Sequence, residues 1–235
     1  MFTLKLYNIW EYRRNKSFLE LLEYNPKAKV IDLGCGNGNF TLKVKEKIGS
    51  ISVYGVDIHE PSLREASKKG IKVVKHDLNI FPYPFDSNEF DVIVSNQVIE
   101  HLYYPVKFLK EIYRILKPGG YVVISTENLA SWDNIFALLL GYVPFSMEFD
   151  ECLVKIGNPL SPHQMEFRSD YQCPHVRILT YKGLIELMKL VGFRIEKVIG
   201  SGHILVIDLF EKLDKRHCRF ITIKARKELE VRNFG

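Results

Sequence analysis

Short apolar runs that alternate with helical stretches constrain the fold of this chain more than any other feature of its sequence. Runs such as Val92-Ile93-Val94 and Val122-Val123-Ile124 are apolar without alternation, which is typical of strands covered by helices on both faces. Strands that alternate with helices of ordinary length form parallel βαβ units with right-handed crossovers. The sequence therefore predicts an α/β fold. The expected strands are 29–33, 52–57, 71–75, 90–95 and 121–126, and the expected helices are 38–48, 61–69 and 106–116.

The segments on either side of this alternation have different patterns. An amphipathic period predicts an opening helix over 8–24, within an N-terminal segment 1–26. Residues 127–177 combine an apolar helical piece at 132–141 with an irregular stretch rich in Pro, Asn, Ser and His. A long segment without periodicity in a compact domain is usually a lid or a binding loop. The pattern then resumes with a helix at 181–191, a strand at 194–199, a short helix at about 204–213 and a strand at 220–225.

Length and composition favour one domain over residues 1–235, since 46% of the residues are hydrophobic and 26% are charged. No apolar run approaches the roughly 20 residues that a bilayer span needs, and the charged N-terminus does not look like a signal peptide. The four cysteines form no C-x-x-C pair, so a zinc knuckle and a redox motif are not indicated. We expect free thiols and a cytoplasmic location. These cysteines are Cys35, Cys152, Cys173 and Cys218.

The net charge of +5 is concentrated at the C-terminal end, where residues 211–235 contain eight Lys or Arg and four Asp or Glu. Nucleic acid or an anionic membrane could use such a segment. No stacking aromatic residues accompany the charges, so we expect a solvated basic face and no nucleic-acid partner.

A glycine-rich turn follows the first predicted strand and leads directly into a helix. Glycines allow a tight turn and let a ligand approach the backbone N–H groups. Asn39 stands where a dinucleotide site would have its third glycine, and no Gly-Lys-Ser/Thr phosphate cradle follows. Asp32, at the strand tip, would repel a pyrophosphate but attract an ammonium or sulfonium group. The turn therefore favours a cationic nucleoside. Its sequence is Asp32-Leu33-Gly34-Cys35-Gly36-Asn37-Gly38.

Two further acids follow the next two predicted strands. Asp57 lies 23 residues beyond Gly34, close to the separation at which a carboxylate binds ribose hydroxyls. Ile58 offers an apolar surface for adenine, and Asp77 could accept a hydrogen bond from an exocyclic amine. The carboxyl ends of parallel strands share one edge, where open sheets bind their ligands. We expect these acids to gather there.

With these motifs in order, the chain resembles the class I S-adenosylmethionine-dependent methyltransferases, in particular the small-molecule branch that includes ubiquinone and menaquinone biosynthesis enzymes. The resemblance implies a three-layer Rossmann-like sandwich, whose seven-stranded, mostly parallel sheet has an antiparallel last strand and an inserted lid. The matching motifs are 30–38, Gly55-Val56-Asp57-Ile58, His76-Asp77-Leu78, the segment 90–102 and Leu116-Lys117-Pro118-Gly119-Gly120.

The resemblance also implies S-adenosylmethionine as the cofactor and assigns its contacts. The glycine turn would hold the methionine part, which Asp32 would orient. The second and third strand tips would bind ribose and adenine, and the residues just past the fourth strand would face the methionine and the acceptor. The implied cofactor-binding residues are Asp32, Gly34, Cys35, Gly36, Asp57, Ile58, Asp77, Leu78, Asn96 and Gln97.

Glu100 and His101 are the candidate catalytic residues. A methyl sulfonium is already activated, so the protein mainly aligns the acceptor and removes a proton if the acceptor is a hydroxyl. His101 could be that base. In the similar ubiquinone O-methyltransferases this segment is thought to hold a metal with a second carboxylate three residues earlier, where this chain has Gln97, so we expect no metal. Alternatively, Glu100 and His101 brace the next helix.

The segment 127–177 is expected to form the acceptor pocket. Arg168, His175 and Arg177 are candidate contacts for an acidic acceptor, whereas Trp132 and Phe136 are expected to pack in the core. The segment is similar to that of uncharacterised methyltransferases associated with surface-glycan biosynthesis. We therefore expect methylation, chiefly of oxygen, on a small molecule or glycan precursor. The alternatives are an RNA or protein methyltransferase and a non-catalytic cofactor-binding partner protein.

Overall fold

The structure is a computed structural model that describes residues 2–147, 156–160, 174–203 and 208–229. Within these ranges no helix combines the length and the apolar character that a membrane crossing requires.

Seven strands form one sheet in the order β3-β2-β1-β4-β5-β7-β6. The pairs β3-β2, β2-β1, β1-β4 and β4-β5 are parallel, and β7 runs antiparallel to both β5 and β6. This order confirms the predicted sheet, including its antiparallel last strand. The strands are β1 (Lys29–Leu33), β2 (Ser52–Asp57), β3 (Lys72–Lys75), β4 (Phe90–Asn96), β5 (Leu116–Glu127), β6 (Phe193–Ser201) and β7 (Phe220–Lys227).

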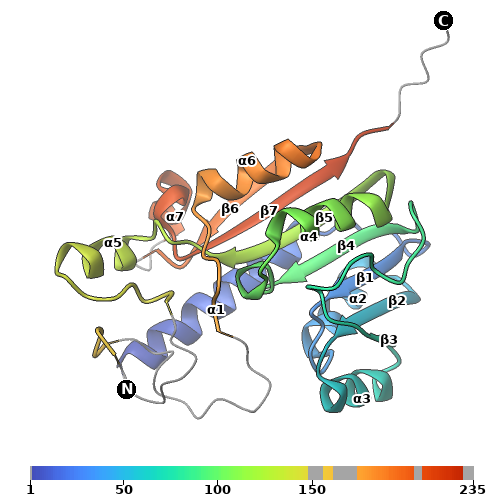
Figure 1. The fold of residues 1–235 in the computed structure, drawn as a ribbon, viewed down its shortest axis with the longest axis horizontal. Helices are drawn as coiled ribbons and strands as arrows, with labels where there is room; N and C mark the ends of the chain where they lie inside the picture. Colours follow the sequence, from blue (N-terminus) through green and yellow to red (C-terminus); the bar gives the residue numbers. More distant parts are fainter. Residues whose placement is uncertain (1, 148–155, 161–173, 204–207, 230–235) are drawn as a thin grey trace, which may run out of the picture.

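Helices cover both faces of the sheet, so the predicted three-layer sandwich is confirmed (Figure 1). Alternate residues of β1 point to opposite faces: Ile31 packs in a core with residues of α4 and α6, and Val30 packs with residues of α1 and α2. The helices are α1 (Phe2–Glu20), α2 (Asn39–Ile48), α3 (Glu60–Lys68), α4 (Pro105–Ile115), α5 (Trp132–Leu139), α6 (Tyr181–Val191) and α7 (Asp208–Leu213), with 3-10 turns η1 (Ile99–His101) and η3 (Lys215–His217).

Most element boundaries lie within two residues of the predicted ones, and the opening helix and β5 differ by more: the helix begins at Phe2 rather than at residue 8. The opening helix ends at Glu20 rather than at residue 24. The chain turns out of the helix because the backbone N–H of Asn25 donates to the Ile48 carbonyl, 2.8 Å away. Strand β5 begins at Leu116, where it pairs with Phe90, and so includes the glycine pair that we expected to precede the strand. A short helix was predicted at about 204–213. Residues 204–207 lie outside the described residues, and the helix is described from Asp208 to Leu213.

The basic C-terminal segment is only in part the solvated face that we predicted: the prediction is wrong for β7 and holds for the cations that precede it. Strand β7 lies inside the sheet with α1 and α6 packed against it, and its cations find partners inside the protein. Arg226 binds Glu196 at 2.6 Å and Glu23 at 2.8 Å, and Lys224 also contacts Glu23. Lys227, nearly buried, donates to the carbonyls of Tyr113 and Leu116. Among the described residues after 210, the exposed cations are Lys212, Lys215 and Arg216.

Candidate functional site

The glycine turn between β1 and α2 forms the centre of the candidate site. Gly34, Gly36 and Gly38 have φ angles of 85°, 52° and 79°, which favour glycine. The backbone N–H of Gly34 donates to the carbonyl of Val56 at 2.8 Å, which fixes the turn against β2. A Cβ atom on Gly34 would collide with the side chain of Val98, so the turn after β4 packs directly on the glycine turn.

Cys35 points its side chain into the protein, and its thiol lies 3.5 Å from the Gly36 carbonyl. Its side chain is buried against Gly55, where even a Cβ atom would lie 2.7 Å from the thiol sulfur. Burial raises the pKa of this thiol, so it stays neutral.

Asp32 lies at the tip of β1 and is almost fully buried, with 2% of its surface exposed. The hydroxyl of Thr41, in the first turn of α2, donates to its carboxylate at 2.6 Å. Burial raises the pKa of Asp32 to about 7, the Thr41 hydrogen bond opposes this shift, and nearby Asp57 adds to it. The site therefore holds a carboxylate that a cationic ligand would help to ionise. Sequence reasoning missed Thr41, although its place in the helix that follows the glycine turn could have indicated it.

Asp57 joins the tip of β2 to the glycine turn. Its Oδ2 accepts the backbone N–H of Gly36 at 2.8 Å, and its Oδ1 accepts that of His59 at 2.9 Å. Ile58 leaves 51% of its surface exposed beside it. The expected pairing of a carboxylate with an open apolar surface is thus present at this tip.

Asp77 lies just past β3, at the third strand tip. The backbone N–H of His76 donates to the Asp57 carbonyl at 3.0 Å, which links this tip to the second one. Asp77 Oδ1 accepts the backbone N–H of Asn79 at 2.8 Å. Leu78 is buried, and its carbonyl accepts the Tyr83 hydroxyl at 2.9 Å. The acids at the three tips lie along one edge of the sheet, as predicted.

Asn96 and Gln97 lead out of β4 on the other side of the turn. The Asn96 amide donates to Asn15 of α1 at 3.2 Å, whereas its buried Oδ1 has no partner among the described residues. Gln97 has a φ of 59°, a strained value for a residue with a side chain, and such strain is concentrated at functional sites. Asn15 was not predicted, because no local pattern shows that α1 reaches the tip of β4.

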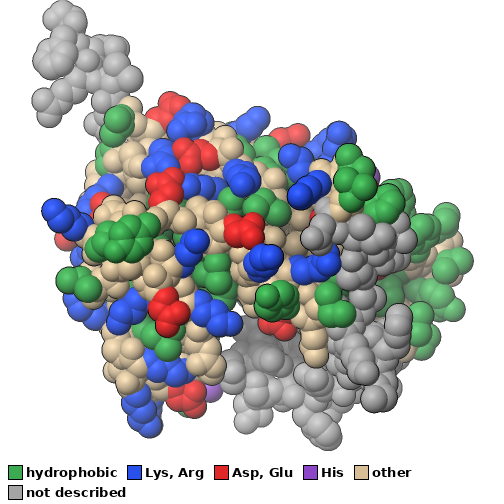
Figure 2. Space-filling model, turned by 180° about the vertical axis from the view of Figure 1, so that it is seen from behind, with side chains coloured by type: hydrophobic (Ala, Val, Ile, Leu, Met, Phe, Trp, Pro, Cys, Tyr) green, Lys and Arg blue, Asp and Glu red, His purple; other side chains and the backbone are tan. Residues whose placement is uncertain are grey.

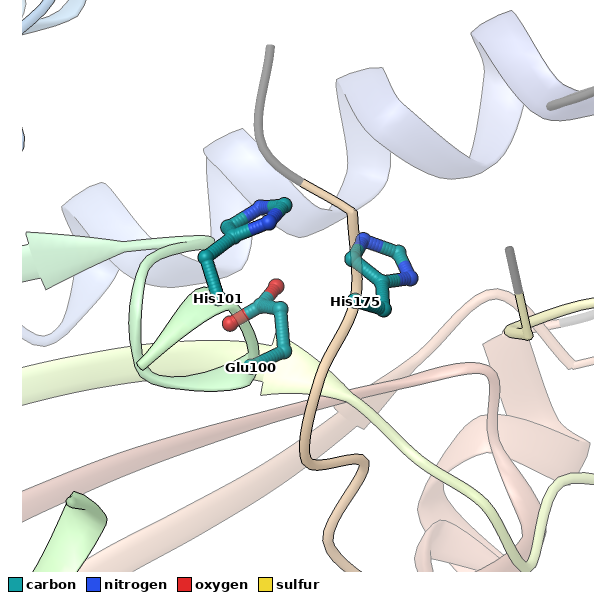
Figure 3. Close-up of side chains that lie close together, drawn as sticks. All are labelled: Glu100, His101 and His175. Carbon is teal, nitrogen blue, oxygen red and sulfur yellow. The ribbon is translucent and has the colours of Figure 1, made fainter. Parts of the chain in front are cut away.

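Glu100, His101 and His175 converge beyond Gln97, although 74 residues separate the two histidines (Figure 3). The centroids of the two imidazole rings lie 4.8 Å apart. The Glu100 carboxylate is fully buried and accepts the Thr126 hydroxyl of β5 at 2.8 Å. In the amide orientation that gives both the side-chain oxygen and the side-chain nitrogen of Gln97 a partner, the nitrogen donates to the Glu100 carboxylate at 3.3 Å.

Backbone hydrogen bonds hold the segment that carries His175 on this turn. The N–H groups of Val176 and Arg177 donate to the Glu100 carbonyl at 2.8 and 3.0 Å. His101 Nδ1 lies 3.1 Å from the Pro174 carbonyl. The predicted acceptor contact His175 is therefore brought to the candidate catalytic pair. Arg177 is exposed and donates through Nε to the Tyr103 carbonyl at 3.1 Å, and Arg168 lies outside the described residues.

This cluster offers proton-transfer chemistry and a possible donor set for a metal. His101 Nδ1 and His175 Nδ1 each lie against a backbone carbonyl, so each must carry a hydrogen, and in a neutral ring the lone pair is then on Nε2. One atom from each residue of the cluster lies within 4.8 Å of the others, and two imidazoles with a carboxylate suit zinc-like cations. Our expectation of no metal stays a prediction. The hydrogen bond from Thr126 means that Glu100 also braces the turn. The catalytic and the bracing interpretations of this residue therefore both have a structural basis.

Comparison with known proteins identifies the family. Residues 31–124, which hold the glycine turn and the three strand tips, match the family described as a methyltransferase domain. The chain carries a methyltransferase domain of the S-adenosylmethionine-dependent class. Together with the relatives described below, this match supports the predicted resemblance and with it S-adenosylmethionine as the cofactor.

Individual relatives agree with this assignment. A protein of Mycolicibacterium smegmatis named as a probable S-adenosylmethionine-dependent methyltransferase is 27% identical over 89% of this chain and 68% of its own length. The demethylmenaquinone methyltransferase of Listeria monocytogenes is 27% identical over 60% of this chain, which spans only 62% of that enzyme. The crystal structure of an S-adenosylmethionine-dependent methyltransferase from Mesorhizobium loti shares the fold, with a TM-score of 0.61 and 20% identity over 90% of this chain and 96% of that one.

Proposed function

We propose that this chain transfers the methyl group of S-adenosylmethionine to an oxygen atom of a small molecule or glycan precursor. The observation that carries the proposal is the contact between Val98 and Gly34, which places the Glu100–His101 turn directly beside the glycine turn of the methyl donor. A donor site and a group that can accept a proton thus share one edge of the sheet. Residues 1–235 are proposed to act as one domain, since the seven strands of the described residues belong to one sheet.

The proposed cofactor contacts follow from the strand tips. Asp32 would face the charged methionine part, because a buried carboxylate gains most from a cation. Asp57 would accept the ribose hydroxyls, Ile58 would cover one face of adenine, and Asp77 with the Leu78 backbone would bind the adenine edge. Asn96 and Gln97 would line the passage from sulfur to acceptor.

The proposed chemistry on the acceptor side is a direct displacement. The acceptor oxygen forms a bond to the methyl carbon, the carbon–sulfur bond breaks, S-adenosylhomocysteine leaves, and the hydroxyl proton passes to His101 Nε2. His175 would orient the acceptor next to His101, and Arg177 and Arg168 are proposed contacts for an acidic group on it. The engaged cations of β7 do not support RNA as the acceptor.

A cytoplasmic location is part of the proposal. The described cysteines Cys35 and Cys218 are free and buried, which agrees with a reducing compartment.

The raised pKa of Asp32 predicts that cofactor affinity depends on pH. In the free protein this carboxyl is largely protonated below pH 7, so binding of a cation must first displace the proton. Affinity for S-adenosylmethionine should therefore rise with pH by up to about tenfold per unit below pH 7 and level off above it. Calorimetry between pH 5.5 and 7.5, in buffers of different ionisation enthalpy, measures both the slope and the released proton.

Two variants show which carboxylate causes this slope. Asp32→Asn should remove the pH dependence, whereas Asp77→Asn, with its carboxylate at another tip of the same edge, should weaken binding but keep the slope. A slope that persists in Asp32→Asn would contradict the assigned contact between Asp32 and the cofactor.

The role of His101 is tested by turnover. Hydroxyl-bearing acceptors, including catechols and sugar nucleotides, are screened for release of S-adenosylhomocysteine. His101→Asn should lower kcat by about 100-fold or more with the accepted substrate, because a positioned base contributes factors of about 10² to 10⁴, and should leave cofactor affinity unchanged.

Other outcomes of this assay separate the alternatives. Cofactor binding without turnover across the whole panel would favour a non-catalytic protein. Full activity in His101→Asn, together with a lower melting temperature, would assign the residue a bracing role only.

A further inference from the structure

Helix α5 buries a polar residue and leaves three leucines at its C-terminal end exposed, whereas an ordinary surface helix buries its apolar side. Its fully buried position is Asn134, whose amide donates to the Asn128 carbonyl at 3.0 Å and to Ser146 at 2.8 Å. The exposed fractions of Leu138, Leu139 and Leu140 are 56%, 77% and 69%. We call these three residues the leucine tip. Polar contacts thus hold the helix firmly while the leucine tip faces outward.

The leucine tip has a shape that suits a fluid apolar medium. Successive residues of a helix point about 100° apart, so three consecutive leucines cover more than half of its circumference. One flat protein surface cannot cover all three, but hydrocarbon can surround them. Tyr142 and Met147, exposed by 44% and 40%, extend the apolar surface on the same loop. In Figure 2, hydrophobic side chains gather at the right-hand end of the molecule, where α5 lies.

Exposed cations lie on the elements next to α5. Trp132 at the start of α5 donates to Asp214 at 2.6 Å, and its ring lies 4.7 Å from that of His217. The neighbouring α7 and η3 carry the exposed Lys212, Lys215 and Arg216, together with Leu209 and Leu213, which are 59% and 73% exposed.

The two acids of this region whose side chains are described, Glu211 and Asp214, have partners within the protein. Glu211 accepts the backbone N–H of Gly202 at 2.9 Å and pairs with Arg13, and Asp214 binds Trp132 and His217. The exposed described side chains of α7 and η3 are therefore cations and leucines.

From this arrangement we infer that α5, α7 and η3 form a docking surface for an anionic lipid bilayer. The leucine tip enters the apolar boundary of one leaflet while Lys212, Lys215 and Arg216 contact the headgroups, the combination that interfacial membrane binding requires. Trp132 and Tyr142 belong to the aromatic types enriched at that depth. Docking brings the edge of the sheet that holds the methyl donor close to acceptors at the membrane surface.

Vesicle sedimentation of the full chain tests this inference. The protein is mixed with vesicles of phosphatidylcholine alone or with about 30% phosphatidylglycerol. We expect binding to the anionic vesicles and at least tenfold weaker binding to the neutral ones. Leu139→Ser with Leu140→Ser should reduce binding at least tenfold. The matched control is Leu190→Ser with Leu229→Ser, whose leucines are 76% and 70% exposed on other elements, and it should bind like the wild type. Lys212→Glu with Lys215→Glu should abolish the preference for anionic vesicles.

The remaining outcomes overturn the inference. They are no sedimentation with either vesicle, equal losses in the two leucine pairs, or unchanged lipid preference after charge reversal. A dimer seen by sedimentation velocity without vesicles, and dissociated by the Leu139 and Leu140 changes, would assign the surface to a second copy instead. Unchanged thermal unfolding of the exposed-leucine variants confirms that any loss of binding reflects the surface and not the fold.

Discussion

Gly34→Ala should lower the affinity for S-adenosylmethionine by at least about 100-fold. The φ of 85° at this position disfavours any side chain, and the added methyl group would collide with Val98. The collision can be relieved only by moving the glycine turn or the turn after β4, and both belong to the proposed cofactor site. Titration calorimetry with S-adenosylmethionine and S-adenosylhomocysteine measures the loss.

Gly70→Ala is the matched control for this substitution. Gly70 has a similar φ of 76°, but a Cβ atom there would meet nothing within 4 Å. Its replacement should cost about 1 kcal/mol of stability, the order expected for a strained backbone, and should leave affinity unchanged. Equal loss of affinity in the two variants would show that backbone strain, and not contact with Val98, controls the site.

Arg219→Ala should destabilise the protein by about 3–5 kcal/mol, because removal of one partner leaves buried carboxylates uncompensated. The Arg219 side chain is only 1% exposed; it contacts Asp133 of α5 and lies 3.5 Å from Glu127 at the end of β5. Its guanidinium also lies 5.6 Å from the ring centroid of Trp10 on α1. One cation thus links three elements around the C-terminal edge of the sheet. Urea unfolding, analysed by linear extrapolation, measures the change.

Arg194→Ala tests whether burial is the cause. Arg194 pairs with Glu196 at 2.9 Å but has 52% of its side chain exposed, so its loss should cost only about 0.2–1 kcal/mol. Removing Asp133 together with Arg219 should recover part of the stability, as a double-mutant cycle would show. A loss at Arg219 no larger than that at Arg194 would contradict a central role for the buried cluster.

The parallel sheet and its cofactor edge could be predicted because their causes are local. Strands β1 and β2 were predicted with the observed bounds, since each is a short run with an acid at its last or next-to-last position. Asp32 and Asp57 could be assigned to one edge because parallel strands place their carboxyl ends together. The glycine turn was recognised because its backbone angles require glycine whatever surrounds it.

The basic segment and α5 were predicted less well because their environment is not local. The charges of β7 were interpreted as a solvated face, yet this strand lies inside the sheet with α1 and α6 packed against it, and Lys224 and Lys227 are buried. Trp132 is half-buried, with its ring stacked 5.7 Å from that of Phe136, and Phe136 is 45% exposed, so neither residue lies in the core as expected. Hydrophobic periodicity identifies an apolar helix without telling which side faces the core.

The sequence by itself determined the fold class, the methyl-donor turn and the acids beside it, because backbone conformation and strand alternation depend on neighbouring residues. Only the tertiary structure decided which distant residues complete the site. Asn15 reaches Asn96, Val98 seals Gly34, and the segment after Pro174 brings His175 to His101. These contacts depend on packing between segments up to 81 residues apart, and no local pattern encodes that packing.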